Sequence, residues 1–518
     1  MRPARALLIG AAVGAVGAIS NVFVSLKAGW SLPVMTTAAV VGLGVARAQR
    51  RELGAKEAVI ATSLASSIAF MTGGGNLAAV PAGAMLGLPV PSAPALVVWF
   101  ALTAILGTLL APLLGRPLRE LRFPTATAAA TLVRHAPSSG APRSALWVST
   151  LGGGVLALIR GVARVPSTIG DVWTFGVDPS LLLVGVGSIM TWTTAWSTLL
   201  GGVVTYGLIA PRLVAAGMAE ASYRSLVAVM VWPAASLLVT SALTELALDA
   251  RKLLRRSDVS APRRRLLAPL AAALVAVALA RYVFELAWPV LLASLPIAVV
   301  FAYVAARSMG ETDVVPTKAL APLAQATVAL AGSGVAGPAI APNLAGAAAL
   351  HAADTLGSVK LATILEVPPE IAVRVRVAGC VAGAVVVVLT LHVLVPDLRA
   401  LPTKELPAPA VLVWKSVAEV VGTGHLPASM HAPIVAGAVL GVLLALLARA
   451  PRFAPYVPSP MGLGSGMVLP GSAALSLFAG ALTRRALEPR AGLAVVTAIA
   501  SGVIAGESLV GLALQLQR

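Results

Sequence analysis

Cysteine is almost absent from this sequence, and acidic and aromatic residues are scarce. Among 518 residues there are one cysteine, Cys380, 20 acidic residues and 4% aromatic residues. One cysteine excludes a disulfide framework and a thiolate cluster around a soft metal. No segment interleaves basic with aromatic residues in the manner of nucleic-acid-binding proteins. The sequence therefore predicts no nucleic-acid partner, no cofactor and no resident metal.

Charged residues of both signs make up only 11% of the chain, whereas hydrophobic residues make up 58%. Soluble domains are about 25% charged and about 45–50% apolar. The apolar residues form continuous runs long enough to cross a bilayer as helices. They do not alternate with polar residues, which argues against a transmembrane barrel. We therefore expect an all-α polytopic membrane protein whose main partner is the lipid bilayer.

The apolar runs predict roughly 12–16 transmembrane helices, together with broken or re-entrant segments. The clearest expected spans are 6–24, 31–47, 55–72, 91–115, 143–162, 179–214 (long enough for two), 222–249, 264–286, 288–307, 376–396, 429–449 and 491–514. Between them lie four apolar segments that are short or interrupted by glycine and proline: 73–89, 122–135, 331–355 and 456–473. Such segments either line a cavity, as in transporters, or are kinked helices and surface loops.

Basic residues, which number 38, gather between the apolar runs. Seven of the 15 residues in 251–265 are basic. Loops with this excess lie on the cytoplasmic side, so we expect a multi-pass protein of a cytoplasmic membrane.

The two sides of this loop resemble each other. Residues 118–131 and 451–465 share a basic residue, phenylalanine, proline, a hydroxyl residue and then small residues. We expect two pseudo-repeat halves, 1–250 and 266–518, joined by a cytoplasmic linker at 251–265.

Several motifs together resemble the oligopeptide transporter family. They are "NVFVSLKAGWSLPV", "FPTATAAATL", "MGETDVVPTKALAPLAQ", "APNLAGAAALHAADTLGSVK", "ELPAPAVLVWKSVAEVVGTG" and "ASGVIAGESLVGLAL", in the order of that family. The match is similar to a prokaryotic branch related to the yellow-stripe-like metal-chelate carriers. This resemblance implies proton-driven uptake of short peptides or peptide-like metal chelates across the inner membrane. The chain departs from the family in its short length and in the residues between Asp354 and Lys360, which include fewer polar side chains than the family's.

Glu507 is the sharpest candidate for a functional residue, because it lies inside an apolar run. A carboxylate at the centre of a membrane helix costs roughly 2.5–3.5 kcal/mol. Glu507 is therefore expected either to carry a proton or contact substrate, or to pair with a basic residue of another helix.

Further candidates lie in the interrupted segments and in the family-like motifs. His351 and Asp354 share a helix face and could bind a metal, relay protons or form a structural polar cluster. Lys27 either faces an anion or reaches the lipid headgroups. The remaining candidates for substrate or coupling-ion contact are Asn21, Asn76, Thr125, Thr127, Asp313, Lys318, Asn343, Lys360 and Ser465.

Enzyme motifs are lacking, since there is no HExxH and no GxGxxG after a strand. We therefore expect a secondary active transporter that works by alternating access, powered by a proton gradient without a cofactor. The alternatives are an intramembrane hydrolase, in which Ser508 would pair with a distant histidine, and a channel. The sequence leaves open whether the protein forms a homodimer.

Overall fold

The protein is described from a computed structural model. The described residues are 3–28, 34–50, 53–114, 116–135, 141–163, 169–172, 174–177, 181–256, 264–315, 317–332, 334–401, 406, 408–422 and 428–516. The predicted linker 251–265 lies partly outside them, so its cytoplasmic position stays a prediction.

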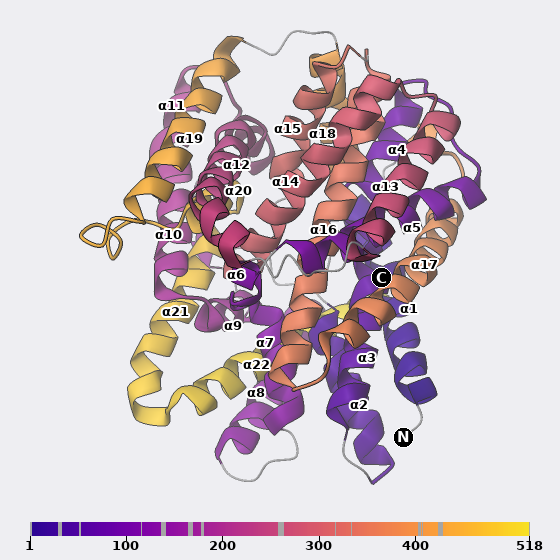
Figure 1. Ribbon diagram of the computed structural model, residues 1–518. Helices are drawn as coiled ribbons and strands as arrows, with labels where there is room; N and C mark the ends of the chain where they lie inside the picture. Colours follow the sequence, from indigo (N-terminus) through magenta and orange to yellow (C-terminus); the bar gives the residue numbers. More distant parts are fainter. Residues whose placement is uncertain are drawn as a thin grey trace.

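Helices make up nearly all of the described chain (Figure 1). The helices of the first part are α1 (Pro3–Ala28), α2 (Met35–Ala48), α3 (Ala55–Ala69), η1 (Phe70–Thr72), α4 (Asn76–Met85), α5 (Ala93–Leu110), η2 (Ala111–Leu113), α6 (Arg116–Arg119), α7 (Pro124–His135), α8 (Ala141–Val162), α9 (Leu182–Ile189), α10 (Trp192–Gly202), the π-helical η3 (Val203–Ile209), α11 (Ala210–Ala215) and α12 (Tyr223–Arg256). Those that follow are α13 (Arg264–Val283), α14 (Trp288–Thr312), α15 (Thr317–Ala329), α16 (Ala336–Ile364), α17 (Pro369–Leu394), η4 (Leu398–Ala400), α18 (Pro409–Gly422), α19 (Ala428–Leu447), α20 (Pro460–Val468), α21 (Gly471–Ala491) and α22 (Leu493–Leu516).

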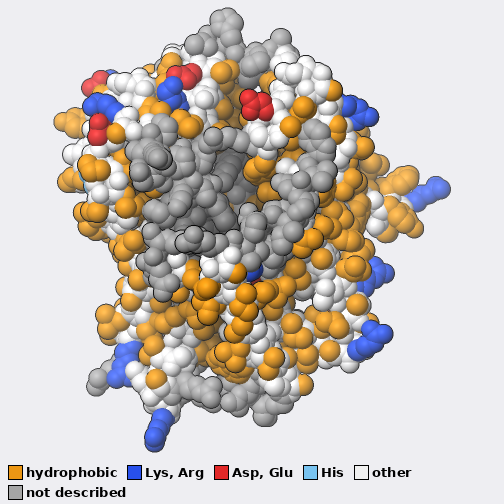
Figure 2. Space-filling view, turned by 180° about the vertical axis from the view of Figure 1, so that it is seen from behind, with side chains coloured by type: hydrophobic (Ala, Val, Ile, Leu, Met, Phe, Trp, Pro, Cys, Tyr) orange, Lys and Arg blue, Asp and Glu red, His pale blue; other side chains and the backbone are white. Residues whose placement is uncertain are grey.

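The expected fold class is confirmed: this is an all-α polytopic membrane protein. Nine helices of the described part are long and apolar enough to cross a bilayer alone. Figure 2 shows hydrophobic side chains over much of the described surface of one face, with charged side chains mostly toward its edges. A small antiparallel hairpin, β1 (Ile169–Val172) and β2 (Phe175–Val177), is an addition that the sequence did not predict.

Helices far apart in the chain pack in pairs. Helices α8, α9, α10 and α12 pack against α22, α21, α20 and α19, in reverse order. Helix α16 is almost entirely buried and runs through the middle of the bundle, where it contacts α3, α4, α5, α7, α14, α15, α17 and α18 (Figure 1). Most side chains on α16 are therefore shielded from both water and lipid, except near its C-terminal end.

Three of the four interrupted segments contain short helices with clear causes for their breaks. The first break has Gly74 and Gly75 at φ +64° and +90°, a conformation that favours glycine. Helix α7 begins at Pro124, in the position where the missing N–H of proline breaks no helical hydrogen bond. Helix α20 ends at Val468, and α21 begins after Pro470.

The prediction of a break in the fourth segment, 331–355, is wrong for most of its length. Ala336–Ile364 is one helix of 29 residues with Pro342 inside it. A proline removes one backbone hydrogen bond, but surrounding helices stabilise the remaining turns of a membrane helix. Packing against many neighbouring helices therefore outweighs the tendency of Pro342 to break the helix.

Glycines let α8 and α22 approach closely. A Cβ atom at Gly506 would collide with the backbone carbonyl of Thr150, and one at Gly502 would collide with Ser149. Small residues at such positions are typical of tightly packed membrane helices.

Substituting Gly506 with alanine is expected to destabilise the protein by about 1–3 kcal/mol, because the backbone of α8 must move away. Gly152→Ala, at a position with no atom within 4 Å of the added Cβ, is the matched control and is expected to be neutral or slightly stabilising. Thermal unfolding in detergent measures both variants. Equal unfolding temperatures would contradict the close contact.

Candidate functional site

Asn343 joins two distant segments at the centre of the bundle. Its amide nitrogen donates to the carbonyl of Gly74 at 3.1 Å and to the side-chain oxygen of Asn76 at 2.9 Å. Its own oxygen accepts a 2.7 Å hydrogen bond from the indole of Trp99. All three polar side chains are buried, so the network holds the glycine break before α4 against the interior of α16.

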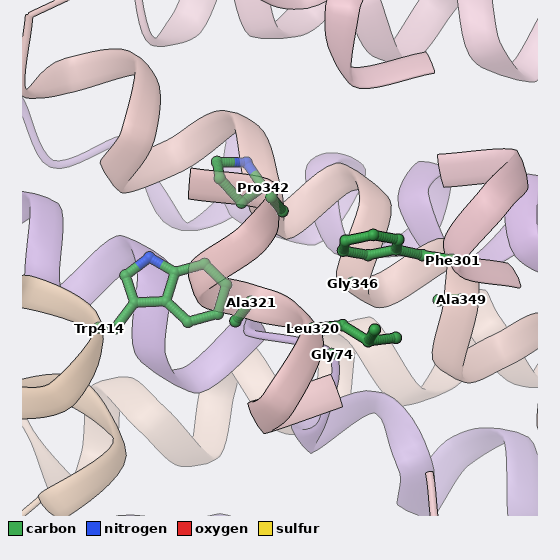
Figure 3. A pocket seen from close by; sticks show the side chains of 9 residues that line it. Gly74, Phe301, Leu320, Ala321, Pro342, Gly346, Ala349 and Trp414 are labelled. Carbon is green, nitrogen blue, oxygen red and sulfur yellow. The ribbon is translucent and has the colours of Figure 1, made fainter. Parts of the chain in front are cut away.

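A small pocket lies beside this network, between α14, α15, α16, α18 and the glycine break. Figure 3 shows Trp414 and Phe301 on opposite sides of the pocket, with Leu320 and Ala321 between them. The indole of Trp414 is fixed by a 2.7 Å hydrogen bond to the carbonyl of Ala339. The free space is about 10 Å³, which holds at most one water molecule. In this conformation the pocket is closed to any larger molecule.

The C-terminal end of α14 contacts the beginnings of two short helices. Asp313 accepts hydrogen bonds from the backbone N–H of Thr125 (3.0 Å) and from its hydroxyl, both at the start of α7. Glu311 accepts a 2.7 Å hydrogen bond from Ser459, the N-cap residue of α20. Ser465, further along α20, lies 3.4 Å from the hydroxyl of Ser308 on α14. The sequence paired the segments of α7 and α20 by similarity, and the structure brings both to one helix end.

Asp354 forms a fully buried ion pair with Arg376 on α17. Its carboxylate also accepts hydrogen bonds from Ser66 on α3, at 2.9 and 3.0 Å. Arg376 donates further to Thr355 and Ser358. Arg376 was not predicted as a site residue, because a span beginning at 376 would place it at a membrane edge. The helix begins instead at Pro369, and two extra turns carry Arg376 into the core.

His351 lies one turn from Asp354 on α16 and is fully buried. Its Nδ1 is 3.9 Å from the thiol of Cys380, and Nε2 has no hydrogen-bond partner in the described structure. The carboxylate of Asp354 is bound to Arg376 and Ser66, and no contact joins it to His351 in the described structure. No three His, Cys, Asp or Glu side chains in the described ranges lie close enough to hold a metal ion.

Glu507 lies between a basic side chain and a helix start. One carboxylate oxygen is 2.6 Å from the guanidinium of Arg160 on α8. The other accepts 2.8 Å hydrogen bonds from the backbone N–H groups of Leu181 and Leu182, where α9 begins. A negative charge at a helix N-terminus is stabilised by the helix dipole. Of the two roles expected for Glu507, this geometry is that of the structural ion pair.

Comparison with known families identifies the chain. A model of the OPT oligopeptide transporter protein family matches residues 4–265 and 249–516, which together span nearly the whole sequence. The chain belongs to the oligopeptide transporter family. None of the curated proteins that were compared matches it significantly. Membership of this family implies transport of oligopeptides across a membrane.

Other predicted residues of this oligopeptide transporter lie in several places. Asn21 on α1 is buried and donates to the carbonyl of Ala69, just before the glycine break. Thr127 donates to the carbonyl of Arg122 at 2.5 Å. Lys360 is half-buried near the end of α16, and its ammonium lies 3.4 Å from the carbonyl of Arg119.

Of the side chains singled out from the sequence, those of Lys27, Lys318 and Ser508 lie outside the described part of the transporter. The predicted sites therefore divide into the asparagine network, the end of α14, the Asp354 ion pair and the Glu507 ion pair. The roles assigned to these residues in transport stay predictions.

Proposed function

We propose that this protein is a proton-coupled secondary active transporter that imports short peptides, or peptide-like metal chelates, by alternating access. We place it in the cytoplasmic membrane of a prokaryote, in the branch related to yellow-stripe-like carriers. The observation that carries the proposal is the meeting of α7 and α20 at the end of α14. Short helices that begin within the bundle are typical of transporter binding sites.

The contacts at the end of α14 support a movement that involves both short helices. Helices α7 and α20 each begin against α14, through Asp313 and through Glu311 with Ser459. A shift of the α14 end would therefore move both short helices together. Alternating access requires such a linked movement of segments from the two halves.

The asparagine network and the closed pocket support a peptide as substrate. Asn343 and Asn76 present amide groups that can exchange hydrogen bonds with a peptide backbone. Phe301, Leu320 and Trp414 form an apolar wall beside them. Because the free space is about 10 Å³, peptide binding requires the short helices α15 or α18 to move outward. A metal chelate would use the same groups to contact its chelator.

Purified protein in proteoliposomes is expected to accumulate short peptides when an inward proton gradient is imposed. The membrane potential adds about 2.3 kcal/mol per charge for each 100 mV, enough for modest accumulation. The measurement is uptake of a labelled peptide panel and of iron and nickel chelates, with and without a protonophore.

Liposomes without protein provide the control for leakage. Saturable uptake that disappears with the protonophore is the expected result. Non-saturating flux would favour the channel alternative, and cleavage of the peptides would favour an intramembrane hydrolase. Equal uptake with and without the proton gradient would contradict proton coupling.

A further inference from the structure

Asp313 occupies an unusual position at the end of α14. It is the residue that ends the helix, and its backbone is in the left-handed region at φ +61°. From there its carboxylate reaches the first turn of α7 and accepts both the N–H and the hydroxyl of Thr125. Next to this contact, the N–H of Phe123 donates to the carbonyl of Gly310 at 2.9 Å. The start of α7 is thus attached to α14 mainly through one carboxylate.

The other acids at these junctions bind arginine. Glu507 contacts Arg160, Asp354 contacts Arg376, and Glu311 is 3.1 Å from Arg307. Protonating Glu507 or Asp354 would leave a partly or fully buried guanidinium without its counter-charge, and protonating Glu311 would remove one of the two acids that bind Arg307. The donors that the structure places on Asp313 belong to Thr125 and are neutral. Protonating Asp313 therefore leaves no cation without a counter-charge at this contact.

We propose that Asp313 binds the coupled proton, and that its protonation releases the start of α7 from α14. This inference rests on the proposed function. The ionised carboxylate accepts from two donors and benefits from the positive end of the α7 dipole. The protonated carboxyl group carries a donor of its own and loses that charge interaction. The backbone N–H of Thr125 is a donor in both states, so proton binding weakens the contact that holds α7.

The charged groups around Asp313 come from several helices. On α14 they are Glu311 and Arg307, and Arg307 also pairs with Glu245 of α12. On α16 the acid is Asp354, which is paired with Arg376 of α17. From α20 the neighbours are the hydroxyls of Ser459 and Ser465. The side chain of Lys318 on α15 lies outside the described residues. In the described part of the chain, each of these acids has an arginine partner.

Release of α7 links proton binding to the substrate path. Helix α7 packs against α2, α9, α16 and α22, and α16 carries the asparagine network. The second attachment, from Glu311 to Ser459 of α20, keeps its arginine partner and stays in place. Protonation therefore moves one short helix relative to the other, which is the asymmetry that a coupled transporter needs.

The first test replaces Asp313 with asparagine, which cannot ionise. In proteoliposomes, Asp313→Asn is expected to lose gradient-driven peptide accumulation while it retains counterflow exchange, since exchange needs no net proton movement. Glu419→Gln, in a partly exposed pair with Lys415 within α18, is the matched acid control and is expected to accumulate peptide normally. Normal accumulation by Asp313→Asn would overturn the proposal, and so would loss of both transport modes in a protein with an unchanged unfolding temperature.

The second test keeps the acid and changes its donor, so that it remains informative if Asp313→Asn fails to fold. Thr125→Val removes the hydroxyl donor to the carboxylate and leaves the backbone N–H. Because that donor stabilises the ionised form, the pH midpoint of uptake is expected to shift to higher pH. Thr390→Val, which loses a hydroxyl bonded within α17, is the control. An unchanged midpoint in Thr125→Val would overturn the proposal. If wild-type protein accumulates nothing under a gradient, the proposed function itself fails.

Discussion

Replacement of Arg376 by methionine is expected to destabilise the folded protein by about 3–5 kcal/mol. The substitution leaves Asp354 buried at the centre of the bundle with only Ser66 as a partner. A buried charge that has lost its counter-ion is among the most destabilising changes known in proteins. Thermal or denaturant unfolding in detergent measures the change, provided that the variant inserts into the membrane.

The double variant Asp354→Leu with Arg376→Met separates stability from function. Removing both charges often restores stability, because neither ion must then be kept away from water. We expect the double variant to be more stable than Arg376→Met alone. If it is less stable, the ion pair does not behave as an ordinary buried pair. If it is stable but cannot exchange peptide, Asp354 participates in transport as the sequence analysis proposed.

Glu507→Gln is expected to destabilise the protein by about 3 kcal/mol, near the lower end for a buried pair, because Arg160 is partly exposed. Glutamine preserves an acceptor for the N–H groups of Leu181 and Leu182 but cannot balance the guanidinium charge. We expect a lower unfolding temperature, with accumulation and exchange reduced to the same extent. Unfolding in detergent and the two transport assays measure these effects.

Glu419→Gln is again the control, because its pair with Lys415 is partly exposed and lies within one turn of helix, and such pairs contribute less than about 1 kcal/mol. A second comparison adds Arg160→Met to Glu507→Gln, which is expected to recover part of the lost stability. The opposite pattern would restore the proton-carrier hypothesis: an unchanged unfolding temperature, intact exchange and no accumulation. In that case the ion pair with Arg160 would be part of the transport cycle.

The interrupted segments show how far local patterns predict this fold. Glycine at 73–75 and proline at 124, 460 and 470 interrupt helices where the sequence predicts, because their backbone restrictions are local. Pro342 has the same restriction, and yet it lies within a continuous helix. The difference is that α16 is surrounded by other helices, which hold its turns in place.

The candidate residues show what local sequence patterns do not predict, namely which residues contact each other. Glu507 was predicted from the sequence because a carboxylate in an apolar run costs free energy in a membrane whichever way the side chain points. Its partner Arg160 lies 347 positions earlier and was not recognised. Thr125 and Asp313, separated by 188 positions, were both predicted, but not as partners. Arg376 was missed because an error of two turns at a helix start moves a side chain from the membrane edge to the core.

The sequence by itself determined the membrane class, the helical fold, the family and the position of most breaks, because hydrophobicity and backbone restriction act within a few turns of helix. Only the tertiary structure decided which helix start each acid holds and which arginine it binds. Those contacts depend on the rotation and depth of helices hundreds of residues apart. A carboxylate such as Asp313 or Glu507 is recognisable as costly from its neighbours in sequence, but what stabilises it is set by its neighbours in space.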